Sequence, residues 1–141
     1  MNKKLLEKLK KMEVESPILF APAASEAEIG CVEASLQSVF SMEYKEFLKI
    51  YGGAMPGPYP VFGINPIDLM DKRLNTVEIV TQYFRRQGWP KVDDGSVISC
   101  NHAGDPIILK NDGTVFMESH DGFGDESWNS FDDFLIWCIN R

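Results

Sequence analysis

The sequence predicts one α+β domain, in which helices pack on an antiparallel sheet. Three observations favour this fold class. Two short amphipathic helices follow each other over residues 25–53, strand-like runs joined by acidic turns fill 96–119, and a last helical pattern follows Ser130. The predicted sheet combines this late three-strand meander with an earlier strand. The 141 residues, 44% hydrophobic and 25% charged, suit a single soluble domain. We expect it over residues 25–141, after a basic helix and linker at 1–24.

The N-terminal piece is predicted to be a short basic helix. Within residues 2–12, Leu5 and Leu9 share one face and five lysines occupy the others. Residues 15–24 contain two prolines, which disfavour helix, and are predicted to be a linker.

The tandem helices carry the strongest local signals. Ser25 and Glu28 have capping-box spacing, and Ser41 can cap the second helix. Apolar side chains then recur at helical spacing: Ile29, Val32, Leu36 and Val39 in the first helix, and Tyr44, Phe47, Leu48 and Tyr51 in the second. Gly52 or Gly53 is predicted to end the second helix in a left-handed conformation.

The middle of the chain is predicted to contain a loop, a short strand and a helix. Three prolines make residues 54–60 a loop, and 61–64 reads as the earlier strand. Capping spacing at Asn75 begins a helix that extends to Gln87 and stops at Gly88.

The meander and the last helix follow. Strands are predicted over 96–101, 106–110 and 114–119, and Asp112-Gly113 gives a strong hairpin turn. Ser130 is predicted to cap the closing helix.

Charge is distributed unevenly along the chain. The formal net charge is −7, yet residues 1–12 carry +4, which leaves −11 for residues 13–141. Eight acidic residues and only two lysines lie between Lys91 and Glu126. Such a surface repels phosphates and attracts a basic partner, so we expect a protein partner and no nucleic acid. Solvated turns that promote solubility are the alternative explanation.

Cysteine usage and hydropathy bear on the compartment. Cys31, Cys100 and Cys138 are widely spaced, with no Cys-x-x-Cys pair, as expected for reduced thiols in a cytosolic protein. We recognise neither a signal peptide nor a membrane-spanning stretch. The sequence therefore predicts a cytoplasmic protein that does not bind a membrane, and it leaves the oligomeric state open.

Two chemical sites were considered, and neither has the required spacing. Cys100 and His102 could share a strand face, but no orienting acid or oxyanion donor accompanies them. Metal ligands could converge at the ends of the meander: His102, Asp105, His120, Asp121 and Asp125. Their spacing matches no known cage, so we expect no metal, no cofactor and no catalytic residue.

Several motifs in this order resemble the SUKH superfamily, of the Smi/Knr type. They are the helix over 29–36, the segment 41–48 with Tyr51-Gly52-Gly53, the hairpin over 104–116, and the closing segment 130–135. The resemblance covers residues ~25–141. It implies an α+β domain without catalysis. Bacterial members look like immunity proteins that bind and neutralise polymorphic toxins, many of them nucleases, and fungal relatives act as interaction modules in cell-wall signalling.

These observations predict an immunity protein with an acidic contact surface for a basic toxin domain. Tyr59, Trp89 and Phe123 lie in or beside loops, where aromatic side chains can anchor a partner. The alternative is that each covers the edge of the core, and for Trp89 this alternative is favoured. The predicted partner-binding residues are Trp89, Asp93, Asp94, Asp105, Asp121, Phe123, Asp125 and Glu126. The alternatives are a regulatory scaffold that binds a signalling or cell-envelope protein and, less favoured, a metal-dependent hydrolase.

Overall fold

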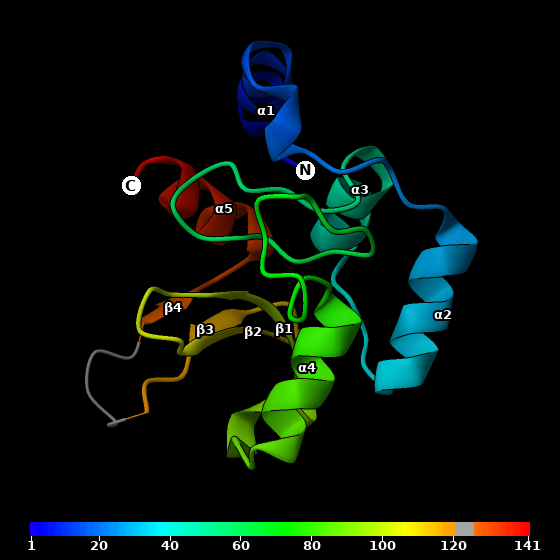
Figure 1. Ribbon diagram of the computed structural model, residues 1–141, viewed down its shortest axis with the longest axis vertical. Coiled ribbons are helices and arrows are strands. Elements are labelled where there is room, and N and C mark those ends of the chain that lie inside the picture. The colour runs from blue at the N-terminus through cyan, green and yellow to red at the C-terminus, as the bar shows by residue number, and fades with distance from the viewer. Residues whose placement is uncertain (121–125) are drawn as a thin grey trace.

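A four-stranded antiparallel sheet in the order β1-β2-β3-β4 forms the middle of the molecule (Figure 1). The computed structural model describes residues 1–120 and 126–141. The strands are β1 (Gly95–Cys100), β2 (Pro106–Lys110), β3 (Val115–Met117) and β4 (Glu126–Trp128). Strands adjacent in sequence pair in the sheet, which confirms the predicted meander.

The described residues form five α-helices outside the sheet. They are α1 (Lys3–Glu15), α2 (Glu26–Leu36), α3 (Met42–Ile50), α4 (Val77–Arg86) and α5 (Phe131–Ile139), and two 3-10 turns are η1 (Pro17–Leu19) and η2 (Pro90–Asp94). The α+β fold class is confirmed. None of the described helices has the length and apolar character needed to cross a bilayer.

The predicted helix starts are confirmed by their caps. Glu28 N donates to Ser25 Oγ at 3.1 Å while Ser25 N donates to Glu28 Oε1 at 3.0 Å, which completes the capping box. Ser130 likewise accepts from the Asp133 amide. For α4 the cap is Thr76, one residue later than predicted.

Two predictions about the tandem helices are wrong. Val39 is 60% exposed, because α2 ends at Leu36 and Gln37 turns the chain in a left-handed conformation. The glycines after α3 are not left-handed, since the positive-φ glycines among the described residues are Gly88, Gly104 and Gly113. Close approach explains Gly52 instead, because a Cβ there would lie 2.1 Å from the Pro22 carbonyl oxygen.

The predicted earlier strand is also wrong. Residues 61–64 contribute only an isolated bridge between Val61 and Ala54, and Phe62 N donates to Ile98 O at 2.8 Å. This single hydrogen bond to β1 does not extend into a ladder. The fourth strand is β4, which lies at the opposite edge.

The sheet lies between α5 and α4 (Figure 1). On the α5 face, Trp128 of β4 packs against Phe134, with ring centroids 5.2 Å apart. On the α4 face, Lys91 Nζ lies 4.1 Å from the Phe116 ring centroid, and Thr81 Oγ1 accepts from Val97 N. These two surfaces are called the α5 face and the α4 face below.

Helix α1 is attached to the domain through α5 and the core. Leu5 and Leu9 are buried, Asn2 N donates to Asp132 Oδ2 at 2.7 Å, and Lys8 Nζ donates to Asn140 Oδ1 at 3.0 Å. The predicted N-terminal helix is therefore confirmed, and it extends further than the sequence indicated, to Glu15.

Candidate functional site

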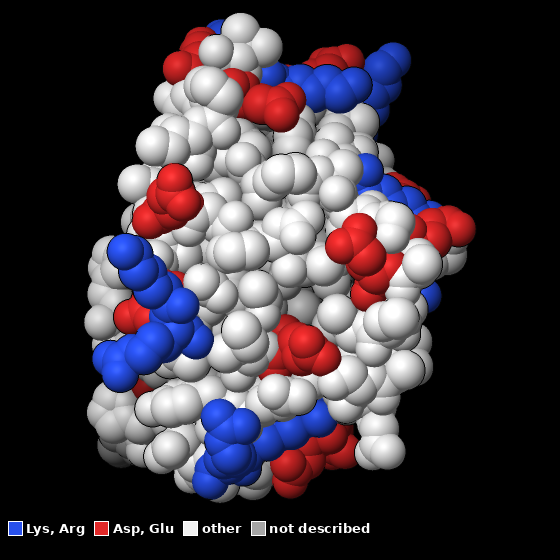
Figure 2. Space-filling view, turned by 45° about the vertical axis from the view of Figure 1, so that its right-hand side comes forward, with Lys and Arg blue, Asp and Glu red and all other residues white. Residues whose placement is uncertain are grey.

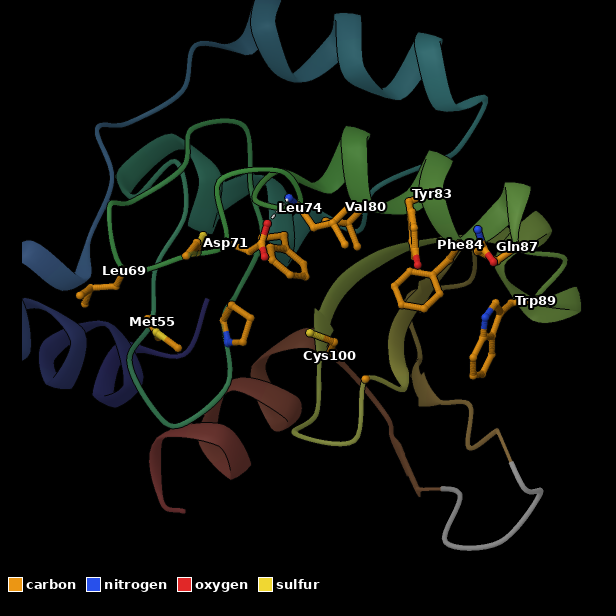
Figure 3. Close-up of a pocket in the computed structure, with 14 residues that line it drawn as sticks. Met55, Leu69, Asp71, Leu74, Val80, Tyr83, Phe84, Gln87, Trp89 and Cys100 are labelled. Atoms are coloured by element: carbon orange, nitrogen blue, oxygen red, sulfur yellow. Dashed lines mark hydrogen bonds between the residues drawn. The ribbon is translucent and has the colours of Figure 1, made fainter.

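An open apolar groove of about 470 Å³ runs beside α4 (Figure 3). Three separate parts of the chain supply its walls: the loop over 55–74, helix α4 with Trp89, and the end of the β1–β2 hairpin. Asp71 is the only charged residue in the lining. We call this feature the α4 groove. Concave, mostly apolar surfaces with few polar groups are typical of binding sites.

Local interactions hold the walls of the α4 groove in place. Asp71 Oδ1 accepts from the amides of Arg73 at 2.7 Å and Leu74 at 3.1 Å, the second of which is drawn in Figure 3. These backbone hydrogen bonds lower the pKa of Asp71. At the other end, Trp89 packs edge-on against Phe84, with ring centroids 5.6 Å apart. Trp89 is half-buried, so part of its ring remains accessible to a partner.

The thiol of Cys100 lines the groove without the features of a nucleophile. Desolvation by burial raises its pKa, whereas a reactive cysteine needs a lowered pKa. His102 lies in the turn beyond β1, where its ring packs against Tyr59 at 4.8 Å and its Nε2 lies 3.3 Å from Pro58 O. The position of His102 is therefore explained by packing on the proline-rich loop.

Asp105 holds two turns together. Its carboxylate is 3.2 Å from the His120 amide, 2.8 Å from His120 Nδ1 and 3.3 Å from Asn101 Nδ2. The residue is 5% exposed, which leaves little carboxylate surface for a partner. The structure thus places this predicted contact residue in a link between the β1–β2 hairpin and the segment after β3.

The other predicted acidic residues lie at two ends of the sheet. Asp93 and Asp94 are exposed and directly precede Gly95, which pairs with Lys110. Glu126 is exposed and pairs with Met117, at the end where β1 finishes. The described carboxylates therefore do not form one continuous surface. Asp121, Phe123 and Asp125 lie outside the described residues.

Surface charge of both signs surrounds an uncharged area on the side that Figure 2 shows. Carboxylates and basic side chains occur close together there, and the broad central area carries neither.

Arg85 connects α4 to several other parts of the fold. Its guanidinium donates to three carbonyl oxygens: Leu36 O at 2.8 Å, Gly95 O at 3.1 Å and Val92 O at 3.3 Å. It also donates to Ser38 Oγ at 3.1 Å. This planar fork ties α4 to the end of α2, to η2 and to β1, which fixes the position of Trp89 and η2.

Metal ligation has little geometric support in the described part of the chain. Across residues 1–120 and 126–141, no group of three or more His, Cys, Asp or Glu side chains is placed to hold an ion. Two of the five ligands considered from the sequence, Asp121 and Asp125, fall in the segment that is not described.

Of the residues that line the α4 groove, Trp89 was among the predicted contact residues, and the predicted contact set does not include the others. The available signal was weak: Leu69, in the loop wall of the groove, is 50% exposed although it is a large aliphatic residue. Exposed aliphatic side chains near one another can indicate a contact surface, but their proximity becomes known only from the fold.

Comparison with known proteins agrees with this architecture. The sequence profile of the SMI1 / KNR4 family (SUKH-1) matches residues 23–137, which includes α2 to α4, most of α5, the whole sheet and the α4 groove. No curated protein matches the chain at a significant level. The chain belongs to the SMI1 / KNR4 family (SUKH-1).

Proposed function

We propose that this protein is an immunity protein that neutralises a cognate toxin by binding it at the α4 groove. Family membership supports an immunity-type role, and the groove supports protein binding by its shape and lining. The proposed action is occlusion, in which no covalent bond of the toxin is made or broken. The observation that carries the proposal is the exposed apolar groove within the family-matched residues.

The proposed anchor is Trp89. Tryptophan is enriched among the residues that dominate binding energy, and such residues lie in partly enclosed apolar surroundings. Trp89 meets both conditions, because it packs on Phe84 and lines the α4 groove. Exposed aliphatic side chains such as Leu69 would extend the contact along the groove.

The proposed electrostatic contribution comes from Asp93 and Asp94. Both are exposed in η2, a few residues after Trp89, and the cation–π contact of Lys91 with Phe116 holds this turn against the sheet. Two exposed carboxylates that follow a groove-lining tryptophan closely in sequence favour a partner that presents basic groups around an apolar side chain. A nuclease toxin with a basic substrate cleft has this character. Glu126 and the undescribed Asp121, Phe123 and Asp125 stay predicted as further contacts.

The test uses the purified toxin domain encoded beside the gene and measures association and dissociation rates. We expect Asp93→Lys with Asp94→Lys to slow association about tenfold at low salt, and less at high salt, because steering is screened by ions. Trp89→Ala should mainly speed dissociation, because it removes an anchor. The matched control is Glu7→Lys with Glu15→Lys on α1, which changes the net charge equally at exposed positions.

Two results would contradict the proposal. One is equal slowing by the η2 and α1 double variants, which would show that net charge acts without a local contact. The other is full toxin inhibition by a Trp89→Ala, Leu69→Ser variant with unchanged dissociation, which would remove the groove from the interface.

A further inference from the structure

Helix α1 has a charge order opposite to that of the other described helices. The helix dipole favours acidic residues in the first turn and basic residues in the last. The first turns of α2, α3, α4 and α5 all contain acidic residues, and the last turns of α3 and α4 contain basic ones. In α1, Lys3 and Lys4 occupy the first turn, while Glu13 and Glu15 occupy the last. This arrangement weakens α1, so its charges need an explanation other than helix stability.

The lysines of α1 also lack acidic partners within the described residues. Elsewhere Lys45 pairs with Glu33 at 3.3 Å and Lys49 with Glu26 at 2.6 Å. None of the five α1 lysines forms an ion pair in residues 1–120 and 126–141, and Lys8 Nζ donates to a neutral amide oxygen of Asn140. Their positive charge therefore lies outside any ion pair, in a protein whose residues 13–141 carry −11.

An apolar groove of about 230 Å³ lies between α1 and α5, on the side of two of these lysines. Leu5, Ile136 and Ile139 contribute to its floor, and Lys4 and Lys8 stand at its rim. Ile136 is 37% exposed, so the floor is accessible. We call this feature the α1–α5 groove. All of α1 lies before residue 23, where the family match begins.

We propose that the α1–α5 groove binds an acidic segment of a protein partner that also carries aliphatic side chains. The lysines at the rim complement carboxylates, and the floor complements leucine-like side chains. This is a second binding surface, distinct from the α4 groove and opposite to η2 in charge. It does not depend on the proposed toxin contact.

The same features disfavour the other anionic partners. A membrane-bound basic helix inserts its apolar face into lipid, but Leu5 and Leu9 of α1 are buried against the domain. Single-stranded nucleic acid is bound with aromatic side chains on which bases stack, and the α1–α5 groove is lined by aliphatic and polar residues. A carboxylate-bearing peptide fits both the rim and the floor.

The test uses the full chain and a short synthetic peptide with Glu and Leu at helical i, i+3 and i+4 spacing. Fluorescence anisotropy at low salt measures its affinity, beside one peptide with Gln for Glu and one with Ser for Leu. We expect both substituted peptides to bind more weakly. Lys4→Glu with Lys8→Glu should weaken binding of the parent peptide about tenfold, the size that two exposed ion pairs can supply.

The matched control is Lys3→Glu with Lys10→Glu, which reverses two charges on α1 away from the groove lining. This control variant should lose clearly less affinity for the parent peptide than Lys4→Glu with Lys8→Glu does. Ile136→Ser should weaken binding of the Leu peptide and leave the Ser peptide unaffected. Circular dichroism verifies that each variant remains folded. The lysine variants are expected to fold because the replaced lysines are exposed.

Three results would overturn the proposal. The first is an equal loss of peptide affinity in the two lysine double variants, and the second is unchanged affinity when Leu is replaced by Ser in the peptide. The third is tighter binding of single-stranded DNA or of phosphatidylserine vesicles than of the peptide. Each leaves the α4-groove proposal standing, because that proposal is tested with the toxin domain and the residues that it assigns to the contact lie outside α1 and α5.

Discussion

The two faces of the sheet differ in how completely they are covered. On the α5 face, the Phe131 ring lies 5.1 Å from that of Tyr44 and 5.3 Å from that of Phe47, and all three side chains are fully buried. On the α4 face, the helix, a loop and Trp89 leave the α4 groove open. The α5 face thus supplies packing energy, and the α4 face retains apolar surface that a partner can cover.

The largest expected contrast comes from one apolar deletion on each face. Phe131→Ala should lower the free energy of unfolding by about 3–5 kcal/mol, because it leaves a cavity among close-packed rings. Leu69→Ser, at the α4 groove, should change it by less than about 0.5 kcal/mol, because that side chain is half exposed. Urea unfolding followed by circular dichroism measures both. A comparable loss for Leu69→Ser would mean that the groove is part of the stabilising core.

A smaller effect is expected where the α4 face joins α2 and β1. Arg85→Lys should cost about 1–3 kcal/mol, because an ammonium cannot reproduce the fork that reaches the carbonyls of Leu36 and Gly95. The neighbouring Arg86→Lys serves as the control, because Arg86 is exposed. Equal unfolding midpoints for the two variants would show that the fork adds no stability to this face.

The smallest effect concerns the half-buried Glu43, beside α5. Burial, followed by the nearby Asp132 carboxylate, raises the pKa of Glu43 above its ordinary value of 4.5. The folded state therefore favours the protonated form, and this contribution to stability is present below pH 4.5 and lost as pH rises through the raised pKa. Glu43→Gln should thus stabilise the protein at pH 7, by less than about 1 kcal/mol after solvent screening. Thermal melts at pH 7 and at lower pH values measure the stability gained by Glu43→Gln. A gain that does not change with pH would refute this prediction.

Local sequence signals predicted the helices well, because caps act within one turn of the chain. Ser25 with Glu28, Ser130 and Gly88 each mark a helix boundary that the structure contains. The role of Gly52 was misassigned, since the contact that requires glycine comes from Pro22, far along the chain. The apolar periodicity that placed Val39 in the first of the tandem helices was also misleading, because α2 ends at Leu36.

The candidate site could be predicted only in part, because its parts meet through tertiary structure. Trp89 was identified from its loop position, but the 55–74 wall of the α4 groove and the end of β1 are brought to it by the fold. For the acidic residues, the sequence suggested a proximity that the fold does not produce. Asp94 and Glu126 belong to one acidic stretch of sequence, yet the antiparallel register places them at different ends of the sheet.

The covering of the β1 edge has a consequence for behaviour at high concentration. Phe62 N and Thr81 Oγ1 occupy hydrogen-bonding groups of Ile98 and Val97 that a strand from another molecule would otherwise use. The opposite edge, β4, is only three residues long. With one edge capped and the other short, the sheet offers a poor template for edge-to-edge growth, so concentrated solutions should resist amyloid-like aggregation.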